Sequence, residues 1–292
     1  MSELDNKKRF AIQAAAALIQ NADFRAFFKG GISQAASKSV CVPGLNCYSC
    51  PGAIGACPIG SLQNSLSSFS VKIPYYLAGP LIFFGALLGR AVCGFLCPFG
   101  FLQDLIYKIP FIKKIKTFKG DKYLRFLKYF ILVFGVIVLP VFIKLTPVFC
   151  KYLCPSGTLS GLLFAFSNTK VFSLFGSRFM WKACIAACII LTGVLIYRPF
   201  CRYLCPLGAF YSFFNKVSAV RLSADKNKCT SCKACYRACN MNVDPSVTPD
   251  HLECIRCGKC ISACPENVLQ YSFFGKCSGK QQKTEKYNQK TF

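Results

Sequence analysis

The stretch from Cys229 to Pro265 reads CTSCKACYRACNMNVDPSVTPDHLECIRCGKCISACP and contains eight cysteines in two matching runs. Each run has the spacing Cys-x2-Cys-x2-Cys-x3-Cys. This spacing is typical of two 4Fe-4S clusters, in which the fourth cysteine of each run ligates the cluster of the other run. It predicts one cluster on Cys229, Cys232, Cys235 and Cys264, and a second cluster on Cys254, Cys257, Cys260 and Cys239.

Zinc thiolates are the alternative for these eight cysteines. Zinc fingers separate paired Cys-x2-Cys knuckles and do not string three cysteines at x2 spacing, which favours iron. Asn240 stands where the first run would ordinarily have Pro, a departure that affects the shape of the loop and leaves the number of ligands unchanged. We therefore predict a small α+β two-cluster ferredoxin domain over residues 220–274.

The composition predicts a membrane part beside this small module. The chain has 292 residues, of which 53% are hydrophobic and 16% charged, and this is apolar for a soluble globular protein. The formal net charge of +25 could indicate nucleic acid, but Lys and Arg gather in loops beside apolar runs. We therefore expect contact with membrane lipid and no contact with nucleic acid.

Haem is excluded by the histidine count. His251 is the only histidine, so no pair of membrane histidines can hold a haem, and no Cys-x2-Cys is followed by His. The chain has 21 cysteines, and their x2 and x3 spacings suit metal thiolates better than disulfides. Any electrons that move through this protein are therefore expected to move through cysteine-bound metal.

Three apolar stretches predict membrane spans: Ile73–Val92, Phe126–Phe149 and Met180–Phe200. Each has close to the ~20 apolar residues that a bilayer core needs. Thr158–Phe166 and Ala209–Phe214 are too short to cross, and we expect them to form surface helices. The fold class is then a mostly α membrane protein with three to four transmembrane helices, short surface helices and the C-terminal ferredoxin domain.

The remaining segments complete the predicted organisation. The apolar run Phe10–Gln20 is too short to span alone, so the N-terminal helix is an interfacial helix, a poor first span or the core of a signal peptide. We divide the chain into an N-terminal helix (1–40), a cysteine-rich loop (41–72), a membrane domain (73–219), the ferredoxin domain (220–274) and a disordered basic tail (275–292).

A basic loop sets the predicted topology. It lies between the first two spans and contains Lys108, Lys113, Lys114, Lys116, Lys119 and Lys122. The positive-inside rule places such a loop in the cytoplasm. The connection around Cys150 is then outside, and the chain after Arg198 is cytoplasmic. We expect a multi-pass protein of the cytoplasmic membrane with its ferredoxin domain in the cytoplasm.

A Cys-Pro-x-Gly motif recurs four times along the chain, and each copy precedes a short apolar stretch. Proline suits the first turn of a helix, and the positive helix N-terminus favours a thiolate or an anionic cluster. The first copy begins at Cys57, and the other three have a further cysteine four residues earlier, which gives the pairs Cys93 and Cys97, Cys150 and Cys154, and Cys201 and Cys205.

Two of these pairs fall on the predicted inner side of the membrane: Cys93 and Cys97, and Cys201 and Cys205. Arg90 and Arg198 stand three residues before the first cysteine of each pair and can neutralise an anionic centre. We predict a shared inner metal cluster on the four cysteines, with the two arginines as cofactor-binding residues. The alternative is that these cysteines cap helices and only pack.

Two further cysteine groups are candidate ligands. Cys41, Cys47, Cys50 and Cys57 lie in a loop rich in Gly and Pro, which can wrap closely around a third 4Fe-4S cluster; disulfides or free thiols are the alternatives. On the outer side, Cys150 and Cys154 could join Cys184 and Cys188, which share a helical face. The stretch KACIAACII around Cys184 and Cys188 is equally typical of small-residue packing between membrane helices.

The chain resembles the membrane polyferredoxins, the family that includes the quinol-oxidising component of periplasmic nitrate reduction and the membrane protein that supports nitrous-oxide reductase. The resemblance covers Cys41–Gln270 and rests on the motifs CGFLCPFG, CKYLCPSG, CRYLCPLG and ECIRCGKCISACP. It implies a relay of electrons between a quinol or cytoplasmic donor and an extracytoplasmic acceptor. The chain lacks a fused flavin domain and has additional cysteine motifs, so the resemblance does not identify the partner enzyme.

Three functions are compatible with the sequence: electron transfer across the membrane as a component of an oxidoreductase system, a metal reductase or maturation factor for a metalloenzyme, and a redox sensor. Only the first requires metal centres that reach the outer face. The expected partners are membrane lipid and redox proteins or quinol. A quinone could bind near Gln63 or Gln103, which occupy equal positions in two repeats, although polar residues on a surface helix are usually solvated.

Overall fold

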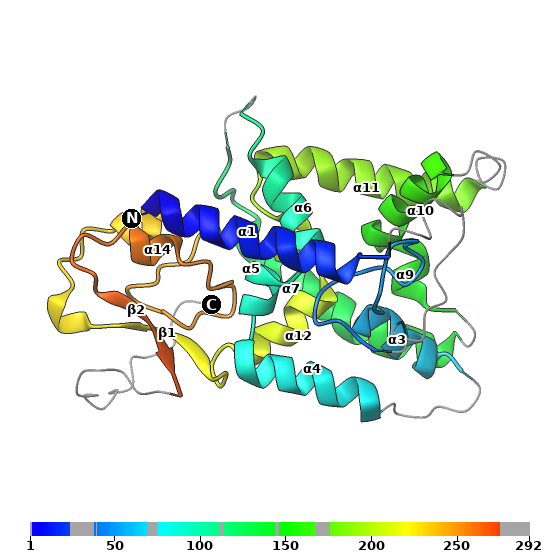
Figure 1. The fold of residues 1–292 in the computed structure, drawn as a ribbon, viewed down its shortest axis with the longest axis horizontal. Coiled ribbons are helices and arrows are strands. Elements are labelled where there is room, and N and C mark those ends of the chain that lie inside the picture. The colour runs from blue at the N-terminus through cyan, green and yellow to red at the C-terminus, as the bar shows by residue number, and fades with distance from the viewer. Residues whose placement is uncertain are drawn as a thin grey trace.

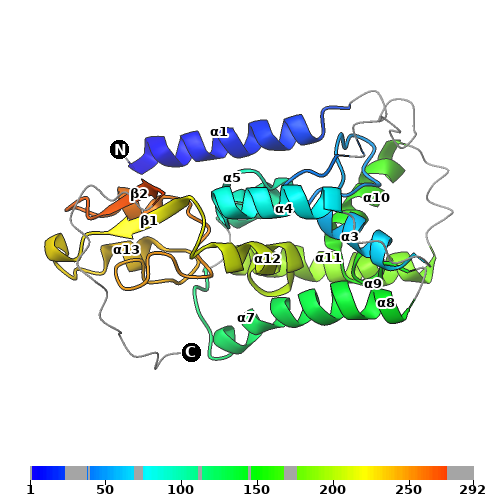
Figure 2. The ribbon, with the colours of Figure 1, turned by 90° about the horizontal axis from the view of Figure 1, so that it is seen from below.

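The computed structural model describes residues 2–23, 38, 40–68, 75–110, 114–143, 146–167 and 176–274. Its longer helices run along the long axis of the molecule, and a two-stranded sheet with short helices forms one end (Figures 1 and 2). The helices α3, α9 and α10 lie at the opposite end in both views. The predicted disordered tail, 275–292, lies outside the described residues.

The elements follow one another in the order α1 (Ser2–Gln20), α3 (Pro58–Leu66), α4 (Tyr75–Leu88), α5 (Ala91–Phe95), α6 (Pro98–Tyr107), α7 (Asp121–Phe130), the π-helical η2 (Ile131–Val138), α8 (Leu139–Phe142), α9 (Val148–Tyr152), α10 (Pro155–Ser167), α11 (Ser177–Leu195), the π-helical η4 (Phe200–Leu204), α12 (Pro206–Phe214), β1 (Val220–Ala224), the 3-10 helix η5 (Lys226–Lys228), α13 (Ala234–Ala238), α14 (Lys259–Ser262) and β2 (Leu269–Phe273).

Each Cys-Pro-x-Gly motif opens a helix, as the sequence predicts. The helices α3, α6, α10 and α12 all begin at the proline of the motif, and the preceding cysteine is the residue that flanks the first turn. Proline is tolerated there because the first N–H groups of a helix have no partner inside it. At Cys205 the sulfur also accepts a hydrogen bond from the backbone N–H of Gly208, at 3.4 Å.

Two segments are long and apolar enough to cross a membrane by length and composition. They are Asp121–Phe142, in which α7, η2 and α8 form one continuous helix, and Ser177–Leu195, which is α11. Both present large apolar side chains outward, for example Phe134 and Leu191. The first predicted span, Ile73–Val92, contributes only the 14-residue α4 to the described residues, and this helix is shorter than a bilayer core requires.

Helix α12 lies inside the bundle, so the expectation of a surface helix for Ala209–Phe214 is wrong. Leu207, Ala209 and Tyr211 are fully buried, and α12 packs against α4, α7 and η2. Its residues are apolar or small, and the Ser212 hydroxyl is paired with that of Tyr129 at 2.8 Å. Helix α12 therefore lacks a polar face to turn toward water. Helix α10, which contains Thr158, packs against α11.

Helix α1 is joined to the bundle by buried polar side chains. The Arg9 guanidinium pairs with Asp104 at 2.8 Å, and the Gln13 amide donates to the carbonyl of Gly94 at 2.8 Å. The helix packs against α5 and α6 and reaches α14 at the sheet end. Its charged and polar residues therefore hold the helix against the bundle, a role that the sequence did not predict.

The sheet end contains the eight closely spaced cysteines. Strands β1 and β2 pair antiparallel, with Leu222 opposite Tyr271, and α13 packs against α14. Helix α7 lies next to this module, since the Arg125 guanidinium donates to the Met241 carbonyl at 3.2 Å. In the segment before α7, the Lys116 ammonium donates to the Arg237 carbonyl at 2.5 Å. The ferredoxin-like module therefore lies at the end of the bundle where α7 begins and α11 finishes (Figure 2).

Candidate metal centres

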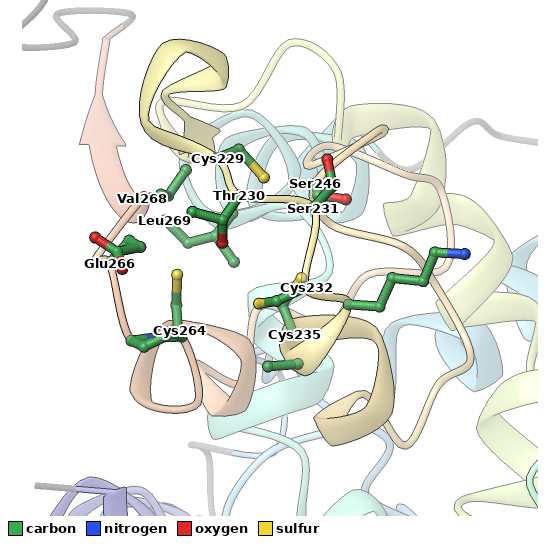
Figure 3. Close-up of a pocket in the computed structure, with 13 residues that line it drawn as sticks. Cys229, Thr230, Ser231, Cys232, Cys235, Ser246, Cys264, Glu266, Val268 and Leu269 are labelled. Atoms are coloured by element: carbon green, nitrogen blue, oxygen red, sulfur yellow. The ribbon is translucent and has the colours of Figure 1, made fainter.

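Four cysteines of the sheet end surround one cavity. Cys229, Cys232 and Cys235 come from the first run, and Cys264 comes from the end of the second run. Figure 3 shows the four side chains around a common space, which Val268 and Leu269 close on the β2 side. The structure thus brings together the crossed set of cysteines named from the sequence.

The other four cysteines line a second cavity. Cys254, Cys257 and Cys260 of the second run meet Cys239 of the first run. Ile255 and Met241 belong to the buried apolar residues next to it. Burial raises the pKa of the Cys254 thiol to about 12, so a thiolate here is costly without a cation. The donor set fits a thiolate-bound iron–sulfur cluster.

The two runs share a backbone conformation that wraps these loops. Left-handed residues occur two and four positions after the first cysteine of each run, at Ser231 and Lys233 and again at Arg256 and Gly258. Left-handed backbone is uncommon for residues with a side chain, and it persists where the surrounding structure requires it. The same turn made twice is a structural repeat that matches the repeat in cysteine spacing.

A third cysteine set lies inside the helix bundle. Cys93, Cys97, Cys201 and Cys205 are buried in one core that includes Phe99, Phe200 and Tyr211. Burial raises the pKa of the Cys201 thiol to about 12, and the neighbouring Cys97 sulfur acts in the same direction. Burial likewise raises the pKa of Cys93 to about 11. The structure brings together the four cysteines of the two inner motifs.

Arg90 and Arg198 exchange partners across this set. The Arg198 guanidinium donates to the carbonyl of Cys93 at 2.5 Å, and the Arg90 guanidinium donates to the carbonyl of Cys201 at 3.2 Å. Both arginines are fully buried. The arginine of each repeat therefore donates to the carbonyl of the first cysteine in the other repeat.

Two carboxylates that sequence reasoning missed hold these arginines. Asp104 pairs with Arg198 at 2.6 Å, and Glu253 pairs with Arg90 at 2.7 Å and also with Lys128. The sequence did carry a signal, because only 11 acidic residues accompany 36 basic ones, and Glu253 directly precedes a ligand cysteine. The charge of each arginine is thus shared between a carboxylate and the cysteine set.

Both carboxylates stay ionised in this environment. Burial alone would raise the pKa of Asp104, but Arg198 and then Arg9 outweigh burial and lower the pKa to about 2. Burial also acts to raise the pKa of Glu253, and the charges of Arg90 and Lys128 lower it to about 2. The arginines are therefore balanced by permanent negative charges.

Gln63 and Gln103 are buried, with 0% and 2% of their surface exposed, so they are not solvated residues of surface helices. The Gln103 amide donates to the Cys201 sulfur at 3.0 Å, and its oxygen accepts the N–H of Phe200 at 3.2 Å. The Gln63 oxygen accepts the N–H of Cys150 at 3.2 Å. Each glutamine joins its own helix to the paired cysteine motif.

The structure groups the remaining cysteines differently from the sequence prediction. Cys47 and Cys57 of the N-terminal loop share a cavity with Cys150 and Cys154. Cys184 and Cys188 lie exposed on α11, since their i, i+4 spacing puts them on its outward face. The two remaining loop cysteines, Cys41 and Cys50, are buried and do not line this cavity.

None of the described cysteines forms a disulfide. Among the described residues, no group of three or more His, Cys, Asp or Glu side chains is arranged to hold a single metal ion.

The ferredoxin-like module contacts the inner cysteine set directly. A Cβ added to Gly94, the residue after Cys93, would lie 2.4 Å from the carbonyl oxygen of Ile255. Ile255 lies between the ligand candidates Cys254 and Cys257. Arg90 adds a hydrogen bond to the Leu252 carbonyl at 2.8 Å. Only a glycine permits this approach of the two backbones.

Comparisons with known proteins agree with these observations. A family described as 4Fe-4S binding domain matches residues 77–119, 127–171 and 177–224, and a second family of the same description matches residues 247–270. No solved structure matches the chain.

Several curated proteins are similar to the chain. An uncharacterised protein of Methanocaldococcus jannaschii is 30% identical over 201 residues, which are 67% of this chain and 69% of the relative. The methylamine utilization ferredoxin-type protein MauN of Methylobacillus flagellatus is 27% identical over 62% of this chain and 60% of its own length. The putative electron transport protein YccM of Escherichia coli is 27% identical over 66% of this chain and 55% of its own length.

These matches define the chain as an iron–sulfur electron-transfer protein with ferredoxin-type domains. It belongs to the membrane polyferredoxin family.

Proposed function

We propose that the protein relays electrons at the cytoplasmic membrane, between the two 4Fe-4S clusters of the ferredoxin module and a cluster held inside the helix bundle by Cys93, Cys97, Cys201 and Cys205. The 4Fe-4S groups supply one-electron chemistry when bound. The protein holds them with thiolates, balances their charge with buried arginines and excludes water from the inner set.

The observation that carries this proposal is the contact at Gly94. It joins the loop of the second ferredoxin cavity to α5, which contains Cys93. Two cysteine sets that could hold clusters are thus neighbours, with backbone touching backbone and no solvent layer between them. A redox sensor needs only the ferredoxin cysteines, whereas a buried set behind them favours a relay.

The arrangement of charge supports the proposed orientation. The segment before α7 lies at the ferredoxin end, where Lys116 contacts Arg237. The end of α11 lies beside the same segment, since the Lys114 ammonium donates to the Val194 carbonyl at 2.9 Å. The basic loop and the ferredoxin module therefore share one side of the two candidate spans. The positive-inside rule favours the cytoplasm for that side.

Iron counting and EPR on the anaerobically purified full-length protein test the inner cluster. We expect Cys93→Ser and Cys201→Ser each to remove the same signal and about four irons, because one 4Fe-4S cluster would lose a ligand. Cys229→Ser should remove a different signal and leave the inner one. Iron equal to the ferredoxin module alone, or separate signals lost in the two inner variants, would contradict a shared inner centre.

Reporter fusions test the orientation. A reporter after Lys119 or at the C-terminus should be active in the cytoplasm, and one at Asn168, in the connection after α10, should be active outside. The reverse pattern would place the ferredoxin module on the other side of the membrane.

A further inference from the structure

The cavity at the end of the bundle far from the ferredoxin module is lined by four thiols from separate parts of the chain. Cys47 comes from the N-terminal loop, Cys57 precedes α3, Cys150 lies in α9 and Cys154 precedes α10. The cavity has a volume of ≈ 490 Å³. Cys57 and Cys154 are buried, and Cys47 and Cys150 are half-buried.

Two thiols of this cavity lie close to the first turns of α3 and α10. A Cβ on Gly60, in the first turn of α3, would lie 3.7 Å from the Cys150 sulfur. A Cβ on Gly157, in the first turn of α10, would lie 3.6 Å from the Cys47 sulfur. The glycine of each Cys-Pro-x-Gly motif therefore lies close to a cysteine that comes from a different segment of the chain. Thiols from distant segments that converge between two positive helix ends are a donor set for an anionic iron–sulfur centre.

The inner set has the same construction as the outer cavity. There α6 and α12 begin at Pro98 and Pro206, and in the outer cavity α3 and α10 begin at Pro58 and Pro155. Gln103 holds the backbone before Cys201, and Gln63 holds the N–H of Cys150. Two Cys-Pro-x-Gly helices and a bridging glutamine thus recur at both places.

A positive charge also recurs at the outer cavity. Pro147 stands where the inner motifs have arginine, but the Lys182 ammonium from α11 donates to the carbonyl of Cys150 at 3.2 Å. This is the contact that Arg198 makes with the Cys93 carbonyl. The missing arginine is thus replaced from another helix, which the sequence pattern alone did not reveal.

The outer cavity and the inner set are joined by a short piece of chain. The backbone N–H of Leu45 donates to the Cys97 sulfur at 3.4 Å, and Cys47 lies two residues further along. Two residues of extended chain span at most roughly 7 Å. The Tyr211 hydroxyl holds the start of this segment by donating to the Pro43 carbonyl at 3.0 Å.

We propose that Cys47, Cys57, Cys150 and Cys154 hold a further 4Fe-4S cluster at the end of the protein opposite the ferredoxin module. Resting on the relay proposed above, this cluster exchanges one electron with the inner cluster, so that one is oxidised as the other is reduced. The cavity opens beside Tyr48 and Tyr76, both exposed, where a redox protein can approach.

The test uses the full-length protein purified without oxygen, with iron, acid-labile sulfide and zinc counted and EPR recorded. We expect Cys47→Ser, Cys57→Ser, Cys150→Ser and Cys154→Ser each to remove the same signal and about four irons. The matched controls Cys41→Ser, Cys50→Ser and Cys184→Ser should keep that signal. The ferredoxin signals serve as a folding control in every variant.

A second variant avoids the risk that a cysteine change unfolds the site. Lys182→Gln should keep the iron content and lower the reduction potential of the outer signal alone, because reduction adds negative charge that the ammonium favours. An unchanged potential, zinc in place of iron, an iron content indifferent to the four cysteine changes, or a loss caused by Cys41→Ser and Cys50→Ser would each overturn the proposal.

The outcome is separable from that of the relay. If the unmodified protein gives an outer signal and no inner signal, and Cys93→Ser keeps the outer signal, the outer cluster is upheld and the inner one is rejected. An inner signal without an outer signal would reject the outer cluster and leave the inner centre intact.

Discussion

The inner and outer cysteine sets use one motif in two different surroundings. Around the inner set, Arg90 and Arg198 are buried and held by Glu253 and Asp104. Around the outer cavity, Lys182 contacts the carbonyl of Cys150 and Lys38 contacts that of Cys50, and the space beside them is ≈ 490 Å³. The motif supplies sulfur and a helix end, and the charges contributed by distant residues distinguish a sealed centre from an accessible one.

The largest effect is expected where a buried ion pair beside the inner set is removed. Asp104→Asn should destabilise the protein by about 3–5 kcal/mol, because it leaves the buried Arg198 without its carboxylate. Thermal unfolding in detergent measures the loss. Asp225→Asn, a change of an exposed Asp in the same protein, is the control and should have little effect. Equal behaviour of the two variants would show that Arg198 does not depend on Asp104.

A smaller loss is expected where the ferredoxin module meets the inner set. Gly94→Ala should cost about 1–3 kcal/mol, because its Cβ would lie 2.4 Å from the Ile255 carbonyl oxygen and one backbone must move. Gly60→Ala is the matched change at the outer cavity, where the nearest atom is 3.7 Å away, and should be tolerated. Thermal unfolding of both variants compares the sites, and similar losses would remove the distinction.

Substitution of Gln103 or Gln63 distinguishes the inner and outer centres by their reduction potentials. Gln103→Met should lower the reduction potential of the inner centre, because it removes a hydrogen bond of 3.0 Å to the Cys201 sulfur. Gln63→Met should leave that potential unchanged, since Gln63 contacts the backbone of Cys150 instead. EPR-monitored titration measures both. A shift in the inner potential with Gln63→Met would mean that the two centres are not electrostatically separate.

The smallest effect is expected at the exposed contact between the segment before α7 and the ferredoxin module. Lys116→Met removes a hydrogen bond to the Arg237 carbonyl at the surface, where water replaces it, so the loss should stay below about 1 kcal/mol. The melting of the ferredoxin EPR signal with temperature checks this. A loss as large as that of Gly94→Ala would move the main docking contact from Gly94 to the surface.

Local spacing predicted the parts of the site that depend on neighbours in the chain. The ferredoxin cysteines are paired by short loops, so their spacing nearly determines which of them share a cavity. The Cys-Pro-x-Gly helices begin at their prolines because that rule is also local. The four inner cysteines could be named together because Arg, Cys, Pro and Gly recur at matching positions in both motifs.

Tertiary contacts decided the rest. Cys47 and Cys57 lie in one loop with Cys41 and Cys50, yet the fold of that loop turns only the first two toward Cys150. Burial of α12 depends on the helices around it, which a short apolar stretch does not specify. The partners Asp104 and Lys182 come from other helices, and single acidic or basic residues carry no periodic signal of their own.

The exchange of arginines has a consequence for the way the two halves of the bundle depend on each other. Arg90 donates to the Cys201 carbonyl, and Arg198 donates to the Cys93 carbonyl, so each half takes a buried positive charge from the other. A chain made only up to α11 would bury Asp104 without Arg198. Each repeat therefore depends on the other for buried charge, although each carries its own cysteines.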